Sequence, residues 1–102
     1  MAVDVFCYVA YDQAIANKLV HKLKLSRRDF FAINFSLSSA RDTAAIHNAI
    51  AIEAGFPKAK AIFLIHLNNK DAAAEILQAA EVVREHFGAP NILLLLENEK
   101  KL

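Results

Sequence analysis

Hydrogen-bonding side chains gather in three short segments, each of which follows or ends an apolar run of the sequence. In an open parallel sheet, ligands bind beyond the carboxyl ends of the strands, where the strand order reverses. Amides, hydroxyls and charged groups at that point could orient a small ligand by hydrogen bonds. The residues predicted to bind a ligand in this way are Tyr11, Asp12, Gln13, Ser38, Arg41, His66, Asn68 and Asn69.

Several of these residues also have a structural explanation. Asp12 stands directly before an amphipathic segment, where a helix cap belongs. His66 lies within an apolar run, as a hydrogen-bonded core histidine would. Ser38 lies in a predicted turn, where serine is common. Cys7 lies inside a predicted strand, which favours a small buried apolar side chain over a reactive thiol.

Common cofactor and metal motifs do not occur in the sequence. It has no GxGxxG and no GxxxxGK[ST] pattern, so Rossmann-type dinucleotide binding and P-loop chemistry are not expected. Asp12 has no acidic neighbour, which argues against the cation site of a phospho-acceptor receiver domain. The four histidines share no ligand spacing with Cys7. We therefore expect neither a metal nor a cofactor.

The composition is typical of one folded domain. The chain has 102 residues, 56% of them hydrophobic, with 2 Gly and 2 Pro, so residues 1–102 are predicted to form a single α/β domain with a frayed tail at 97–102. The 12 Lys and Arg against 11 Asp and Glu disfavour general nucleic-acid binding. One cysteine and no signal peptide favour a cytoplasmic location, and no membrane association is expected.

Hydrophobic periodicity predicts strands that alternate with helices. The predicted strands are 3–9, 28–35, 61–67 and 91–96, and the predicted helices are 13–25, 43–54 and 72–87. This alternation predicts a three-layer α/β fold, a flavodoxin-like parallel sheet of four strands in the order 2-1-3-4.

That strand order leaves one face of the last two strands without a covering helix. These strands are the most apolar segments of the chain, AIFLIHL and NILLLL. Because large exposed apolar patches are rare on soluble monomers, a second copy or a partner protein is expected to cover them. The predicted interface residues are Ile92, Leu94 and Leu96, on the strand-4 side of the sheet.

Three stretches of the sequence carry a resemblance to a known family. They are VDVFCYVAYDQAIANKLVHKL, FAINFSLSSARD followed by IHNAI, and AKAIFLIHLNN. In layout they are similar to TIR and TIR-like domains, including a bacterial group found in antiphage signalling systems. The resemblance implies a domain that either self-assembles or binds and cleaves nucleotides such as NAD. It also implies that Glu75 corresponds to the glutamate of the catalytic members.

Two functions from different classes follow. The preferred one is a small cytosolic signalling or protein-interaction module that acts through self-association or a partner protein. The alternative is a nucleotide-binding or NAD-cleaving TIR-like enzyme, with its site at the carboxyl ends of predicted strands 1 and 3. A structural fragment or designed variant without an activity of its own is a third possibility.

Overall fold

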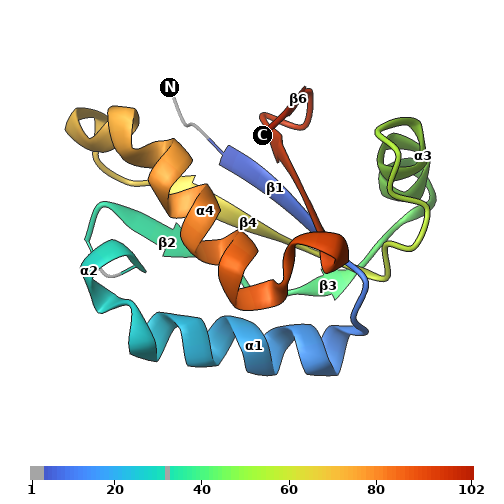
Figure 1. Ribbon diagram of the computed structural model, residues 1–102, viewed down its shortest axis with the longest axis horizontal. Coiled ribbons are helices and arrows are strands. Elements are labelled where there is room, and N and C mark those ends of the chain that lie inside the picture. Colours follow the sequence, from blue (N-terminus) through green and yellow to red (C-terminus); the bar gives the residue numbers. More distant parts are fainter. Residues whose placement is uncertain (1–3, 32) are drawn as a thin grey trace.

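The computed structural model describes residues 4–31 and 33–102 (Figure 1). Its strands are β1 (Asp4–Val9), β2 (Phe35–Leu37), β3 (Arg41–Asp42), β4 (Ala61–Leu67), β5 (Ile92–Leu96) and β6 (Lys100–Lys101). Its α-helices are α1 (Gln13–Ser26), α2 (Arg28–Phe31), α3 (Ala45–Glu53) and α4 (Ile76–Phe87), and its 3-10 helices are η1 (Lys70–Glu75) and η2 (Ala89–Asn91). None of the helices in the described part of the chain has the length and hydropathy that a membrane span requires.

The strands form one sheet in the order β2-β4-β1-β5-β6, and β3 also pairs with β4. Every neighbouring pair is antiparallel. The predicted parallel, flavodoxin-like sheet of order 2-1-3-4 is therefore wrong. The units β1-α1-β2 and β4-α4-β5 do join parallel strands, but each leaves a gap that an antiparallel strand fills, which is the split βαβ layout of ferredoxin-like folds.

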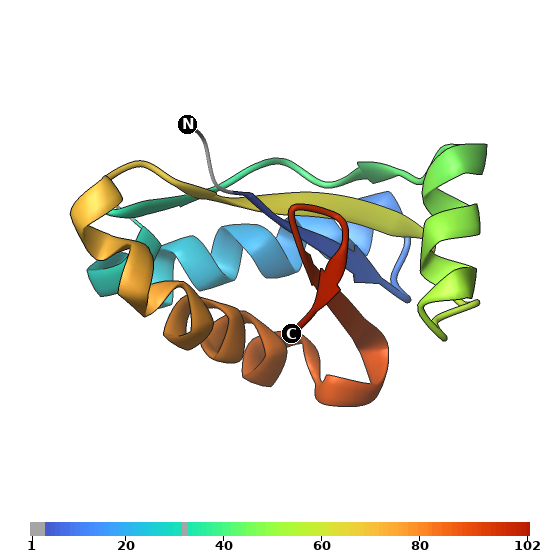
Figure 2. The same ribbon diagram turned by 90° about the horizontal axis from the view of Figure 1, so that it is seen from above.

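Helix α3 explains why the direction of β4 was predicted incorrectly. The helix predicted at 43–54 exists, but it lies at one end of the sheet (Figure 2) and does not cross a face between parallel strands. Its position lets the chain turn back, so β4 runs antiparallel to both β2 and β3. Hydrophobic periodicity cannot distinguish such a helix from a crossover helix, because both have one apolar side.

Local signals predicted several elements correctly. β1, α1, β4 and β5 match the predicted segments closely, although Val3 of the first predicted strand lies outside the described residues. α1 begins after Asp12, whose Oδ1 accepts a hydrogen bond from the backbone N of Ile15 at 2.9 Å. The buried positions Ala16, Val20 and Leu23 of α1 follow the expected helical spacing.

The predicted strand at 28–35 is wrong over its first half. Residues Arg28–Phe31 form α2, in which the backbone N of Phe31 donates to the carbonyl of Arg27 at 3.1 Å. The Arg27 guanidinium also binds Asp29 through two bonds of 3.0 and 2.9 Å. These local bonds overcome the strand propensity of the aromatic side chains. Strand β2 begins only at Phe35.

The main core lies between the sheet and the helices α1 and α4, which cover the same face of the sheet (Figure 2). The rings of Phe63 and Phe87 stack there with centroids 5.1 Å apart. Cys7 and Leu94 lie in the same cluster and are almost inaccessible to solvent. This face of the sheet is therefore closed by the chain itself.

The opposite face of the sheet is covered only at one end. There α3 and the segment after it pack on Tyr8, Ile62 and Leu93 in a second, smaller cluster. Next to this cluster, side chains of the sheet are partly buried or exposed. We define the open face as the surface formed by Phe6, Ser36, Arg41, Leu64 and His66.

The C-terminal residues, predicted to fray, form a hairpin in the structure. Glu97 and Asn98 have positive φ angles of 51° and 63°, which turn the chain sharply after β5. β6 then pairs with β5, and the backbone N of Leu102 donates to the carbonyl of Leu94 at 3.0 Å. The hydroxyl of Tyr8 donates to Oδ1 of Asn98 at 2.5 Å, so the turn is tied to β1.

Candidate protein-binding face

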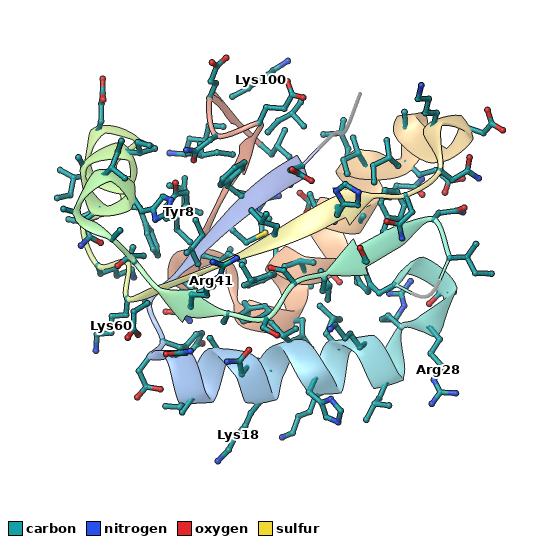
Figure 3. All side chains as sticks on the ribbon, turned by 180° about the vertical axis from the view of Figure 1, so that it is seen from behind. Tyr8, Lys18, Arg28, Arg41, Lys60 and Lys100 are labelled. Carbon is teal, nitrogen blue, oxygen red and sulfur yellow. The ribbon has the colours of Figure 1, made fainter. Side chains whose placement is uncertain are left out.

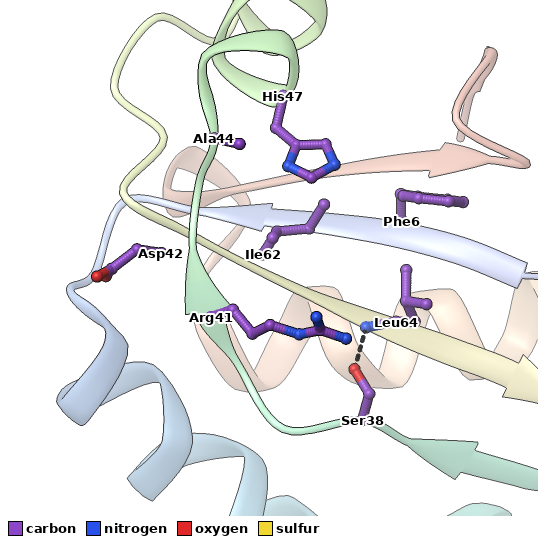
Figure 4. Close-up of a pocket in the computed structure, with 8 residues that line it drawn as sticks. All are labelled: Phe6, Ser38, Arg41, Asp42, Ala44, His47, Ile62 and Leu64. Carbon is purple, nitrogen blue, oxygen red and sulfur yellow. Dashed lines mark hydrogen bonds between the residues drawn. The ribbon is translucent and has the colours of Figure 1, made fainter.

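The open face contains a shallow depression of about 300 Å³ next to α3 (Figure 4). Its lining combines an apolar floor with polar and charged groups at the rim. The lining residues are Phe6, Ser38, Arg41, Asp42, Ala44, His47, Ile62 and Leu64.

Strand register brings the floor and the rim together. Phe6 lies opposite Leu64 in the β1–β4 ladder, and Arg41 lies opposite Ile62 in the β3–β4 ladder. Residues directly opposite each other in antiparallel strands have their side chains on the same face. The three strands therefore place a cationic side chain beside an apolar surface on a rigid backbone. Figure 3 shows Arg41 on this face, with α4 behind the sheet.

The link between β2 and β3 is held in place by side chains. Ser38 donates its backbone N to the carbonyl of Leu64 at 3.0 Å, and its hydroxyl accepts from the backbone N of Leu64 at 2.8 Å. Asn17 of α1 pairs with both backbone groups of Ala40, as donor to the carbonyl at 3.1 Å and as acceptor from the N at 2.7 Å. These four bonds hold the backbone of the segment directly before Arg41 in place.

Arg41 is exposed, and its guanidinium has no ion pair or side-chain hydrogen bond with residues 4–31 or 33–102. Figure 4 shows the side chain lying along β4 towards Ser38 and Leu64, whereas Asp42 points away from it. Arg41 therefore offers a planar set of five N–H donors that can bind a carboxylate by two parallel bonds.

His47 of α3 adds a second polar group to the rim. Its ring lies edge-on to Tyr8, with centroids 6.3 Å apart. Its Nδ1 is inaccessible to solvent and has no hydrogen-bond partner among the described residues. Buried polar atoms are normally hydrogen-bonded, so this nitrogen is an exception within the fold.

The predicted ligand site is divided between opposite ends of the sheet. Because β1 and β4 are antiparallel, Val9 pairs with Ala61 and Asp4 pairs with His66. Residues that follow β1 and residues that end β4 therefore cannot converge. A site at the carboxyl ends of both strands requires parallel strands, and that premise is wrong.

At the carboxyl end of β1, the predicted residues stabilise the fold. The Tyr11 hydroxyl donates to the carbonyl of Phe87 at 3.0 Å, Asp12 caps α1, and Gln13 is the exposed first residue of that helix. Only Ser38 and Arg41, of the eight predicted ligand-binding residues, are brought together in the depression.

At the carboxyl end of β4, His66 lies on the open face, and its Nδ1 is 2.6 Å from Oδ1 of Asp4. Asn68 accepts from the Ser36 hydroxyl at 3.3 Å. Asn69 accepts from the backbone N of Asp71 at 3.1 Å and so caps η1. These contacts give the amides local structural roles.

Glu75, implied as a catalytic residue by the TIR resemblance, is exposed at the junction of η1 and α4, and its side chain makes no capping hydrogen bond there. It does not line the depression. Across the described chain, no three His, Cys, Asp or Glu side chains are grouped as metal ligands would be.

The predicted interface residues face the helices. Ile92 is 6% and Leu94 1% exposed, and both belong to the main core, while Leu96 packs against that core and is partly buried. The parallel order had placed one side of this strand in solvent. In the antiparallel sheet, α1 and α4 cover it, and Phe6 and Leu64, on the other face, are only partly buried.

Among the lining residues of the depression that were not predicted are Phe6, Leu64 and His47. Phe6 alternates with Val5 and Cys7 in β1, so the period of two did place it on the other side of the sheet. Leu64 has the same alternation in β4. His47 was considered only as a metal ligand. No sequence signal indicates that α3 lies at the sheet end and leaves this face open.

Three comparisons with known proteins agree. The family model described as CDI System Immunity Component matches residues 1–100. Immunity protein CdiI-2 of Burkholderia pseudomallei (strain 1026b) is 32% identical over 99 residues, which cover 97% of each chain. A chain in the structure of a CdiA-CT/CdiI toxin and immunity complex from Burkholderia pseudomallei superimposes with a TM-score of 0.92 and 30% identity, covering 97% of this chain and 95% of that one.

These findings overturn the resemblance to TIR-like domains, and with it both the signalling module and the NAD-cleaving enzyme. The similarity to TIR domains was one of element layout, which the antiparallel sheet does not share. The expectation of a partner protein is in line with the complex that the similar structure contains. The chain belongs to the family of CDI system immunity components.

Proposed function

We propose that this chain binds the toxin domain of its own CDI system and thereby blocks that toxin. The observation that carries the proposal is the match in fold, at a TM-score of 0.92 over 97% of the chain, to a protein chain in a toxin and immunity complex. The family model and the curated immunity protein support it over nearly the same length.

The structure is suited to binding a protein without a large rearrangement. The open face is supported by β1 and β4, which are paired over six residues with a closed core beneath them. Side chains on such a rigid sheet lose little conformational freedom on binding, which favours affinity.

The cytoplasmic location predicted from the sequence, and the homo-oligomer predicted as the alternative to a partner protein, remain part of the proposal. A single cysteine, buried at Cys7, is compatible with a reducing compartment. Cell fractionation tests the first of these, and light scattering of the purified chain across a dilution series tests the second.

The function is tested by co-expressing the chain with the CdiA-CT toxin domain of the same CDI system in a bacterium that the toxin inhibits. We expect growth to be restored and the two proteins to co-purify as a complex. The matched control is the CdiA-CT domain of the Burkholderia pseudomallei complex, which reports how specific the pairing is. Failure to bind the cognate toxin and to restore growth would overturn the proposal.

A further inference from the structure

We infer that the toxin docks on the open face, with an apolar toxin side chain over Phe6 and Leu64 and a toxin carboxylate bound to Arg41. The inference rests on the proposed function and specifies the surface and the partner chemistry. It is carried by the juxtaposition of a partly exposed apolar floor and a guanidinium that has no ion pair or side-chain hydrogen bond among residues 4–31 and 33–102.

The apolar floor of the depression offers area that a partner can bury. Phe6 and Leu64 lie side by side in the register of β1 and β4 and are only partly buried, in contrast to Cys7 and Phe63 on the other side of the same strands. An apolar side chain seated there would remove more surface from water, and each Å² of apolar area removed contributes about 25 cal/mol.

The charge of Arg41 indicates which group of the partner it would bind. Its guanidinium lies over the edge of the floor, and the nearest acidic side chain in sequence, Asp42, points away from it (Figure 4). Arginine at the edge of an apolar patch is typical of binding surfaces, because it can pair with a carboxylate in a bidentate manner. The complementary group on the toxin is therefore an aspartate or glutamate.

Among residues 4–31 and 33–102, no other surface combines a partly exposed apolar floor on the sheet with an arginine that has no ion pair. The face under α1 and α4 is closed. The large exposed apolar side chains are distributed over several elements: Ile15, Leu25, Ile33, Ile46, Ile52 and Leu77. Scattered apolar residues are normal on protein surfaces and do not indicate an interface.

The test measures the affinity of the purified chain for the cognate CdiA-CT toxin domain by calorimetry or interferometry. R41E reverses the charge at the rim, and L64S removes an apolar side chain from the floor. The matched controls are R28E, at an exposed arginine of α2 away from Arg41 (Figure 3), and L77S, at a leucine of α4 that is 57% exposed. Circular dichroism melts establish that each variant is folded.

We expect R41E to weaken binding by roughly 100-fold or more, because it sets a carboxylate against the toxin carboxylate, and L64S by roughly 10-fold. R28E and L77S should bind like the unmodified chain. Raising the salt concentration should weaken the unmodified complex more than a complex with R41A, because R41A has already lost the charge pair.

The outcomes separate the inference from the function. If the unmodified chain does not bind the toxin, the proposed function is overturned. If it binds and R41E and L64S bind equally well, the docking face is overturned while the function stands. If only L64S weakens binding, the carboxylate contact is overturned. If the free chain is a dimer that R41E dissociates, with toxin binding unchanged, the face belongs to a second copy of this chain.

Discussion

Asn17 of α1 makes two hydrogen bonds to the backbone of Ala40, one to its carbonyl and one from its N, at 3.1 and 2.7 Å. Its amide thus pairs with the β2–β3 link as a neighbouring strand would. Ala40 is 1% exposed, so water cannot readily replace these bonds. The contact connects the helix layer to the segment that carries Arg41.

Substitution of Asn17 should therefore destabilise the fold. N17A leaves two nearly buried backbone groups without partners, and each such group costs about 1–3 kcal/mol. We expect the free energy of unfolding, measured by urea denaturation, to fall by about 2–6 kcal/mol in total. The matched control is Q78A, which removes an exposed amide from α4 and should change stability by less than about 0.5 kcal/mol. Equal stability of the two variants would contradict the role of the contact.

Leu94 should stabilise the fold and should not contribute to toxin binding. It is 1% exposed and lies in the cluster beneath α1 and α4. L94A should lower the free energy of unfolding by about 2–5 kcal/mol, because it leaves a cavity, while the folded fraction keeps its affinity for toxin. L77A, at an exposed position of α4, is the control and should be nearly neutral. Loss of toxin affinity in a stably folded L94A would show that β5 contacts the partner.

The local structure could largely be predicted from the sequence, whereas strand pairing could not. Segment 61–67 is apolar except for His66, and residues 13–25 have clear helical spacing, so both elements were recognised. Nothing within either segment specifies its neighbours in the sheet. Pairing is determined by where α3 lies, and its apolar side is compatible with a crossover or with a position at the sheet end.

The residues of the candidate site could also be predicted only in part from the sequence. Ser38 and Arg41 were recognised as polar residues of a connecting segment, and they do line the depression. Phe6 and Leu64 were placed in apolar strands, but neither was predicted to line a site or an interface. Which of the two sheet faces remains uncovered is a property of the whole topology, so no local pattern could distinguish Phe6 from Cys7.

Asp12 and Glu75 should differ in how much they contribute to the stability of the fold. Asp12 accepts the backbone N–H of Ile15 at the start of α1, so D12A should destabilise the protein by about 0.5–2 kcal/mol. Glu75 makes no capping bond, so E75A should stay within about 0.5 kcal/mol. Thermal melts of the two variants provide the measurement. A larger loss in E75A than in D12A would contradict these assignments.

Cys7 should be unreactive in the folded protein and should make stability depend on alkaline pH. Burial between the sheet and the helices raises the pKa of its thiol well above the usual value. We therefore expect 5,5′-dithiobis(2-nitrobenzoate) to react with the thiol only after unfolding in urea, because the thiolate is the reacting species.

The sign of the pH effect follows from linkage. In the unfolded chain the thiol loses its proton near its ordinary pKa of about 8.5, whereas in the folded chain it stays protonated. The folded state then binds more protons, so the free energy of unfolding falls as the pH rises from about 8.5 towards the folded pKa, by up to about 1.4 kcal/mol per pH unit. Burial also raises the pKa of Tyr8, which adds a similar slope at higher pH. C7A is the control. We expect it to be less stable than the unmodified chain at neutral pH, and its free energy of unfolding should fall less steeply between pH 8 and 10. Parallel curves for the two proteins in urea titrations would show that the thiol ionises equally in both states.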